Sequence, residues 1–99
     1  MQKEKLIAID VFCARHEVEI SFVSSLQQTG LIEIIIIKET GFINSDQLQL
    51  LEKFIRFHYE MNINLEGIET ISYMLQRMIN LQEQNISLIN RLRLYEANE

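Results

Sequence analysis

The stretch that decides the fold is residues 10–31, DVFCARHEVEISFVSSLQQTGL. Asp10 is a favourable N-cap residue immediately before an apolar-periodic segment, so the sequence predicts a first helix over residues 11–16. Phe12 should turn inward on this helix. A turn is expected around residues 17–18, before the next periodic segment begins.

The second half of this stretch predicts another short helix. Ile20, Val23 and Leu26 recur at three-residue spacing, which predicts one buried helical face. Gly30 follows where a helix-closing glycine belongs. Two short helices joined by a tight turn are typical of the helix-turn-helix motif, whose second helix reads DNA.

The second helix has the wrong chemistry for that task. Residues 19–28 read EISFVSSLQQ and contain no lysine or arginine. DNA affinity comes largely from basic side chains that neutralise phosphates. We therefore interpret this helix-turn-helix as a scaffold that binds a protein.

Composition supports the same interpretation. The 99 residues suffice for one domain, and 9 Lys and Arg against 14 Asp and Glu give a net charge of −5. An acidic domain is repelled by nucleic acid and by anionic membranes.

The sequence also predicts where the protein resides. The apolar run at residues 6–9 is too short for a signal peptide core, and no run approaches the about 20 apolar residues of a membrane span. The single cysteine fits a reducing compartment. We expect a cytoplasmic protein.

Residues 31–38 contain four consecutive isoleucines, which favour a β-strand because branched side chains pack well on a pleated surface. Thr40 and Gly41 are expected to form a turn, and residues 42–43 a returning strand. This pattern predicts a small hairpin, or wing. An exposed strand of this kind invites aggregation, so we expect helices or a partner to cover it.

Asn44 followed by Gln47 has the spacing of a capping box and predicts a third helix over residues 45–61. Two adjoining apolar faces on that helix suggest burial on both sides. They contain Leu48, Leu51, Ile55 and His58 on one side, and Leu50, Phe54, Phe57 and Met61 on the other.

Asn64 predicts the start of a long fourth helix, with Glu66 in its first turn where the helix dipole favours an acid. Eight residues of this helix alternate at spacings of three and four, as in the seam of a coiled coil. We expect this seam to form a dimer; the alternative is that it packs on the third helix of its own chain. The seam consists of Ile71, Met74, Met78, Leu81, Asn85, Leu88, Leu92 and Tyr95.

The sequence contains no recognisable catalytic or metal-binding pattern. It lacks a phosphate loop and a nucleophile elbow. His16, His58 and Cys13 have no metal-ligand spacing, and Cys13 and His58 are interpreted as buried or rim residues of the core. We expect no enzyme activity, catalytic residue, metal or cofactor.

The order of these elements resembles the MerR-type regulators. The similarity runs from Ile9 to Gly30, through the hairpin, and into residues 62–68. It implies a mainly α fold: a winged helix-turn-helix with a small β-hairpin wing and a long C-terminal dimerisation helix. We expect residues 1–61 and 62–99 to form these two parts of one compact domain. The departures fall at residues 24–26, in the wing isoleucines and at Glu17, positions where MerR proteins carry DNA contacts or a turn glycine.

The chain is more similar to the chaperone modulator CbpM family, which shares the MerR-like scaffold. The matching motifs are residues 12–13, 30–33, 56–60, 65–68, 81–85 and 90–92. The resemblance implies that the chain binds the J-domain of a DnaJ-like co-chaperone of the CbpA type and restrains its stimulation of a DnaK-type chaperone. Candidate partner-binding residues are acids near turns and helix starts: Glu17, Glu19, Glu60, Glu66 and Glu69.

Two other functions stay open. A DNA-binding transcription regulator would require Arg15, Lys38, Lys53 and Arg56 to gather on one face of a dimer. A structural adaptor would use the isoleucine run and the coiled coil to join a larger assembly. The acidic balance disfavours nucleic acid.

Overall fold

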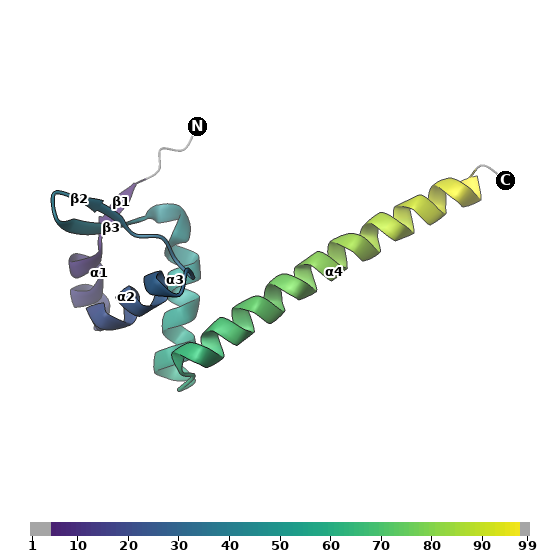
Figure 1. Cartoon of the computed structure of the whole chain (residues 1–99). Helices are drawn as coiled ribbons and strands as arrows, with labels where there is room; N and C mark the ends of the chain where they lie inside the picture. The colour runs from purple at the N-terminus through teal and green to yellow at the C-terminus, as the bar shows by residue number, and fades with distance from the viewer. Residues whose placement is uncertain (1–4, 98–99) are drawn as a thin grey trace. The chain divides into compact units, whose positions relative to one another are not determined.

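The computed structural model describes residues 5–97, so residues 1–4 and 98–99 of the two expected parts lie outside it. The described chain is mainly helical with one small sheet (Figure 1). Its contacts divide it into two units, one ending at Glu69 and the other beginning at Thr70. The elements are β1 (Leu6–Ala8), α1 (Ile9–His16), α2 (Ile20–Gln28), β2 (Ile35–Ile37), β3 (Thr40–Asn44), the short 3-10 turn η1 (Ser45–Gln47), α3 (Leu48–Ile55), the π-helical turn η2 (Arg56–Glu60) and α4 (Leu65–Ala97).

The turn between α1 and α2 is closed by a left-handed residue. Glu17 has φ 55° and caps α1, while the Val18 amide donates to the Cys13 carbonyl at 3.0 Å. Helix α1 begins two residues earlier than predicted, with Ala8 rather than Asp10 at its N-cap. The prediction was wrong because Asp10 bonds locally instead: its Oδ1 accepts from the amide of Val11 at 2.8 Å.

Helix α2 ends as predicted, at a glycine with positive φ. Gly30 has φ 83°, its amide donates to the Gln27 carbonyl at 3.0 Å, and the Leu31 amide donates to the Leu26 carbonyl at 2.9 Å. This paired arrangement is a Schellman motif, which favours glycine. The predicted buried face is partly wrong, because Ile20 is exposed and Phe22 takes its place in the core beside Val23 and Leu26.

The predicted hairpin exists, but its turn and its size differ. Strands β2 and β3 pair antiparallel with Ile37 opposite Thr40, so the two turn residues are Lys38 and Glu39. Thr40 and Gly41 therefore belong to β3 and do not form the turn. A third strand, β1, pairs with β3 on its other side, which gives the order β1-β3-β2.

Helix α3 is preceded by η1, and the predicted capping box is only half formed. The Asn44 side chain accepts from the Asp46 amide at 3.4 Å. The Gln47 side chain instead bonds to the backbone of Glu33. Its Oε1 accepts from the Glu33 amide at 2.8 Å, and its Nε2 donates to the Glu33 carbonyl at 3.1 Å. The loop before β2 is thereby tied to the start of α3.

The helix continues past α3 as the π-helical turn η2, where the Met61 amide donates to the carbonyl of Arg56, five residues back, at 3.2 Å. Asn64 then caps α4 as predicted, because its Oδ1 accepts from the Gly67 amide at 2.8 Å. Among the described residues, no helix is both long and apolar enough to cross a membrane.

The core of the first unit lies where α1, α2, β3, α3 and the start of α4 meet. It combines residues of the two helices of the helix-turn-helix, α1 and α2, with residues that follow them in the chain. Its buried members are Ile9, Phe12, Cys13, Val18, Phe22, Val23, Leu26, Ile32, Ile43, Leu51, Phe54 and Ile68.

The hairpin turn generates a stability prediction. Lys38 and Glu39 both have positive φ, 49° and 65°, which disfavours residues with a Cβ. Replacing them with Asn and Gly, the pair that this turn geometry prefers, should stabilise the first unit by about 1 kcal/mol. Slower amide exchange in β3 would report this gain. Lys53→Asn, an exposed change within α3, is the control and should not slow that exchange.

Cys13 generates a reactivity prediction. Burial raises the pKa of its thiol, and the nearby Asp10 carboxylate adds to this shift. Because the folded pKa exceeds the unfolded one, the stability that Cys13 contributes is present below the unfolded pKa and is lost as the pH rises through the folded value. Alkylation of the folded protein at pH 8 should therefore be about tenfold slower, or more, than that of the unfolded chain.

The control for this reaction moves the thiol by two residues. Val11 is exposed on the same helix, so a Cys13→Ala/Val11→Cys variant should be alkylated quickly while folded. Mass spectrometry would measure both rates. Equal rates for the native and the moved thiol would contradict the burial of Cys13.

Candidate functional site

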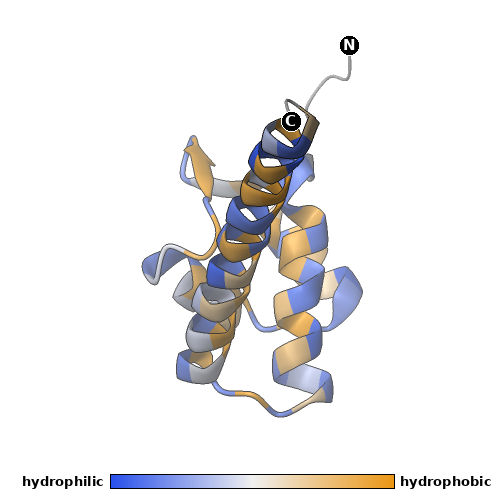
Figure 2. Ribbon diagram, turned by 90° about the vertical axis from the view of Figure 1, so that its right-hand side faces the viewer, coloured by the Kyte–Doolittle hydropathy of each residue, from blue (hydrophilic) through white to orange (hydrophobic). Residues whose placement is uncertain are grey.

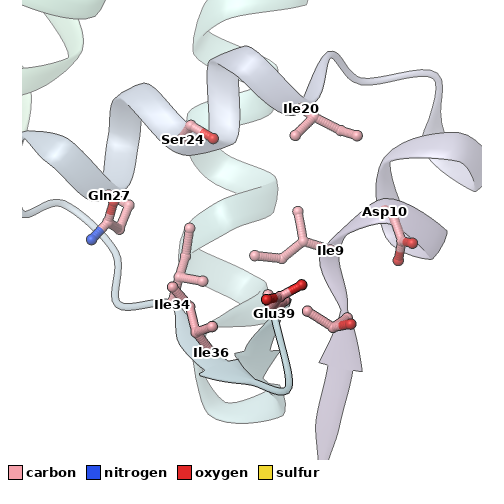
Figure 3. A pocket seen from close by; sticks show the side chains of 10 residues that line it. Ile9, Asp10, Ile20, Ser24, Gln27, Ile34, Ile36 and Glu39 are labelled. Atoms are coloured by element: carbon pink, nitrogen blue, oxygen red, sulfur yellow. The ribbon is translucent and has the colours of Figure 1, made fainter.

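A groove lies between α2 and the hairpin (Figure 3). We call it the α2–hairpin groove. Its volume is about 380 Å³. Figure 3 shows the side chains of Ile20, Ser24 and Gln27 on one wall and those of Ile34, Ile36 and Glu39 on the other. The complete lining is Ile9, Asp10, Ile20, Ser24, Gln27, Ile34, Ile36, Glu39, Thr40 and Gly41.

The charge of this groove is acidic. Asp10 and Glu39 are the ionisable side chains in its lining, and both are acids. The basic residues that DNA binding would require lie elsewhere: Arg15 is on α1, Lys53 on α3 and Arg56 in η2, while Lys38 is in the hairpin turn without lining the groove. The lining of the groove is therefore apolar and acidic.

A second concave surface brings together some of the predicted partner-binding acids. We call it the acidic hollow. Its volume is about 430 Å³, and it lies between the turn after α1 and the helical stretch formed by α3 and η2. Two predicted partner-binding acids, Glu17 and Glu60, both line it, although they lie far apart in the sequence. The complete lining is His16, Glu17, Val18, Glu52, Ile55, Arg56, Tyr59 and Glu60.

The acidic hollow also contains an acid that the sequence analysis missed. Glu52 lines it with Glu60, and Arg56 lies between them in sequence. Residues 52, 56 and 60 recur at four-residue spacing on one helical stretch, so they share a face. That spacing was the signal available in the sequence. Arg56 Nε lies 3.9 Å from Glu60 Oε2, but both side chains are exposed and the pair contributes little stability.

Aromatic side chains connect η2 to α2 beside the acidic hollow. The Glu19 amide donates to the Tyr59 hydroxyl at 3.0 Å, which ties the start of α2 to η2 and holds Glu19 near the hollow's edge. His58 stacks on Phe22 with ring centroids 4.4 Å apart, and its Nδ1 lies 3.0 Å from the Ile63 carbonyl oxygen. His58 is thus a rim residue of the core, as predicted.

The other two predicted acids are not part of the hollow. Glu66 and Glu69 lie on the first turns of α4 and are exposed. The structure therefore gathers Glu17, Glu19 and Glu60 around one surface and places Glu66 and Glu69 on another element.

The predicted seam lies wholly on the second unit, which begins at Thr70, and most of its side chains are exposed. Hydrophobic and hydrophilic bands alternate along the α4 ribbon (Figure 2). Ile71 is half-buried, while Asn85 and the other seam residues are exposed to solvent. A row of exposed apolar side chains on one helix is a surface that a second helix can cover.

Metal binding has no support among residues 5–97, where no three His, Cys, Asp or Glu side chains are grouped to hold an ion. His16 instead packs on Phe12, with ring centroids 4.3 Å apart, and Cys13 is only 3% exposed. These residues take structural positions in the helix-turn-helix.

Comparison with known proteins identifies the family. No curated protein and no solved structure matches the chain. A family model described as the MerR HTH family regulatory protein matches residues 7–90, which spans every element from β1 to most of α4. The observed helix-turn-helix, hairpin and long last helix agree with that match. The chain belongs to the MerR family of helix-turn-helix regulatory proteins.

Proposed function

We propose that this chain is a non-enzymatic modulator that binds the J-domain of a DnaJ-like co-chaperone of the CbpA type and restrains its stimulation of a DnaK-type chaperone. The observation that carries the proposal is the chemistry of the α2–hairpin groove. The groove lies within the segment that the MerR family model matches, but its lining is apolar and acidic. The resemblance to the chaperone modulator CbpM family supports the same partner, which would place the protein in the cytoplasm.

Charge complementarity supports this partner. The basic helix that J-domains present to their chaperone would meet Glu17, Glu52 and Glu60 in the acidic hollow, with Glu19 at its edge. Opposite charges steer association and fix orientation, and their effect weakens as salt rises. Occupation of the basic helix would keep it from the DnaK-type chaperone, which gives restraint without any chemical reaction.

Glu66 and Glu69 are a second set of candidate contacts. Both are exposed at the start of α4, where acids also complement the helix dipole. Their contribution to J-domain binding is separable from that of the hollow, because the two sets can be neutralised independently.

DNA-binding regulation is the second candidate function, and membership of the MerR family is the observation that favours it. It would require Arg15, Lys38, Lys53 and Arg56 to supply the phosphate contacts from outside the groove. Fluorescence anisotropy with duplex DNA at low salt tests it directly, because electrostatic binding is strongest there. Absence of binding at low salt would exclude this function.

Neutralising the hollow should weaken J-domain binding. We expect a Glu17→Gln/Glu60→Gln variant to bind an isolated CbpA-type J-domain about fivefold more weakly, with a flatter dependence on salt. Isothermal titration calorimetry at low and moderate salt would measure both effects. A Glu66→Gln/Glu69→Gln variant measures the second set of acids in the same way.

The matched control for this experiment is Glu83→Gln/Glu96→Gln, which removes two exposed charges from α4 outside both sets. It keeps the net charge equal to that of the hollow variant. Equal affinity of the hollow variant and the wild-type chain would remove Glu17 and Glu60 from the interface. No binding of the wild-type chain at either salt would overturn the proposed function.

We also infer that the chain acts as a homodimer through the seam of α4. A surface of this kind, exposed along most of the helix, is stabilised when a second copy covers it. Asn85 is the one polar seam residue, and a single Asn in such a seam fixes register and partner number at a cost in stability. Sedimentation of the wild-type chain as a monomer at high micromolar concentration would contradict the dimer.

Replacing Asn85 tests whether this residue faces the partner helix in the seam. Asn85→Leu should raise the melting temperature of the dimer and permit additional oligomeric states, because it exchanges a desolvated amide for an apolar contact. Asn90→Leu is the control, since Asn90 lies on the same helix outside the seam. Analytical ultracentrifugation and thermal unfolding would compare the two. Equal effects of both substitutions would argue against this register.

A further inference from the structure

The α2–hairpin groove is separate from the acidic hollow in its lining and differs from it in chemistry. We propose that the groove receives the apolar side chains of a basic amphipathic helix of the partner protein. This inference rests on the proposed function, because it assigns a second contact of the same J-domain partner. The two surfaces meet at the start of α2, where Ile20 lines the groove and Val18 lines the hollow.

The apolar part of the groove has two exposed walls and a packed floor. Ile20 on α2 is 52% exposed, and Ile36 on β2 is 73% exposed. Between them lies Ile9 (Figure 3), and a Cβ at Gly41 would lie only 3.4 Å from a methyl carbon of Ile9 and 3.3 Å from one of Ile34 on the hairpin wall. Ile20 and Ile36 remain exposed on the two walls, so a molecule seated in the groove would bury apolar surface on both.

The charged part of the groove selects a cationic occupant. Asp10 and Glu39 lie in its lining, and the lining contains no lysine or arginine. An occupant that carries acids or phosphates would be repelled, while lysine or arginine beside its apolar residues would pair with these carboxylates. Ser24 and Gln27 add hydrogen-bonding groups on the α2 wall.

The hairpin turn holds one of these acids in place. Glu39 adopts φ 65°, beside Lys38 at φ 49°, so both turn residues occupy a conformation that residues with a Cβ disfavour. Figure 3 shows the Glu39 carboxylate directed into the groove near Ile9. The conformation of the turn thus separates the two charges: Glu39 lines the groove and Lys38 does not.

A helix fits these walls better than DNA does. A partner helix that presents apolar residues at spacings of three and four can contact Ile20 on one wall and Ile36 on the other. Its intervening basic residues would then reach Asp10 and Glu39. A DNA backbone offers no apolar side chains for the isoleucines and brings negative charge to both carboxylates.

The strand itself supplies a matched control. Side chains alternate between the faces of a strand, so Ile36 faces the groove while its neighbour Ile35 does not line it. Ile35 is 40% exposed on the same three-residue strand. Both positions are solvent-accessible, so Ile36→Ser and Ile35→Ser should keep the fold, and circular dichroism would verify this for each variant.

The experiment is a calorimetric titration of the full-length wild-type chain, Ile36→Ser and Ile35→Ser against an isolated CbpA-type J-domain. We expect Ile36→Ser to raise the dissociation constant about tenfold, since it removes an apolar anchor from the interface. Ile35→Ser should stay within about twofold of the wild-type chain. The weakening by Ile36→Ser should persist at moderate salt, because burial of an apolar side chain is not screened.

The outcomes separate this inference from the proposed function. If the wild-type chain binds the J-domain and Ile36→Ser binds equally well, the groove is not part of the interface, while the proposed function stands. Equal weakening by Ile35→Ser and Ile36→Ser would also overturn the inference. If the wild-type chain does not bind, the proposed function fails and the inference fails with it.

Discussion

The hydrogen bond from the Val18 amide to the Cys13 carbonyl, 3.0 Å long, sets the arrangement on which both surfaces depend. It closes α1 with Glu17 in the left-handed region, a conformation that disfavours a residue with a Cβ by about 1 kcal/mol. Burial of Val18 offsets that cost, since enclosing such a side chain contributes about 1.5–3 kcal/mol. Packing of Val18 in the core therefore stabilises the turn at Glu17.

The same turn distributes the residues that follow it. Val18 enters the core from the wall of the acidic hollow, while Ile20 is left exposed on the wall of the α2–hairpin groove. One local conformation thus generates two neighbouring surfaces with different chemistry. The MerR scaffold needs the buried residues of this segment for its fold, and the exposed residues are free to change without loss of the core. That division explains how a helix-turn-helix can keep its fold with an α2 that contains no lysine or arginine.

Much of the fold could be predicted from the sequence because local signals carried it. The Gly30 and Asn64 caps act within a few residues, and the helices they bound have clear periodicity. Strand β1 could not be predicted, because its three residues gain their structure from pairing with β3 some 36 positions away, Ile7 opposite Ile43. The hairpin turn was misplaced because its two residues, Lys38 and Glu39, lack the usual turn chemistry, while Gly41 supplied a misleading signal. Of the candidate site, the individual acids were recognisable, but neither the convergence of Glu17 with Glu60 nor the groove follows without tertiary packing.

The π-helical turn η2 limits how this family member can change in length. A π-turn accommodates one more residue per hydrogen-bonded ring than an α-helix does. Deleting a single residue within Arg56–Glu60 would let the segment relax to a regular helix, but it would change the positions that its side chains occupy on the turn. His58 would then leave its stack on Phe22, and the Tyr59 hydroxyl would leave the Glu19 amide. Relatives that share the π-helical turn should therefore tolerate substitutions within this segment far better than insertions or deletions.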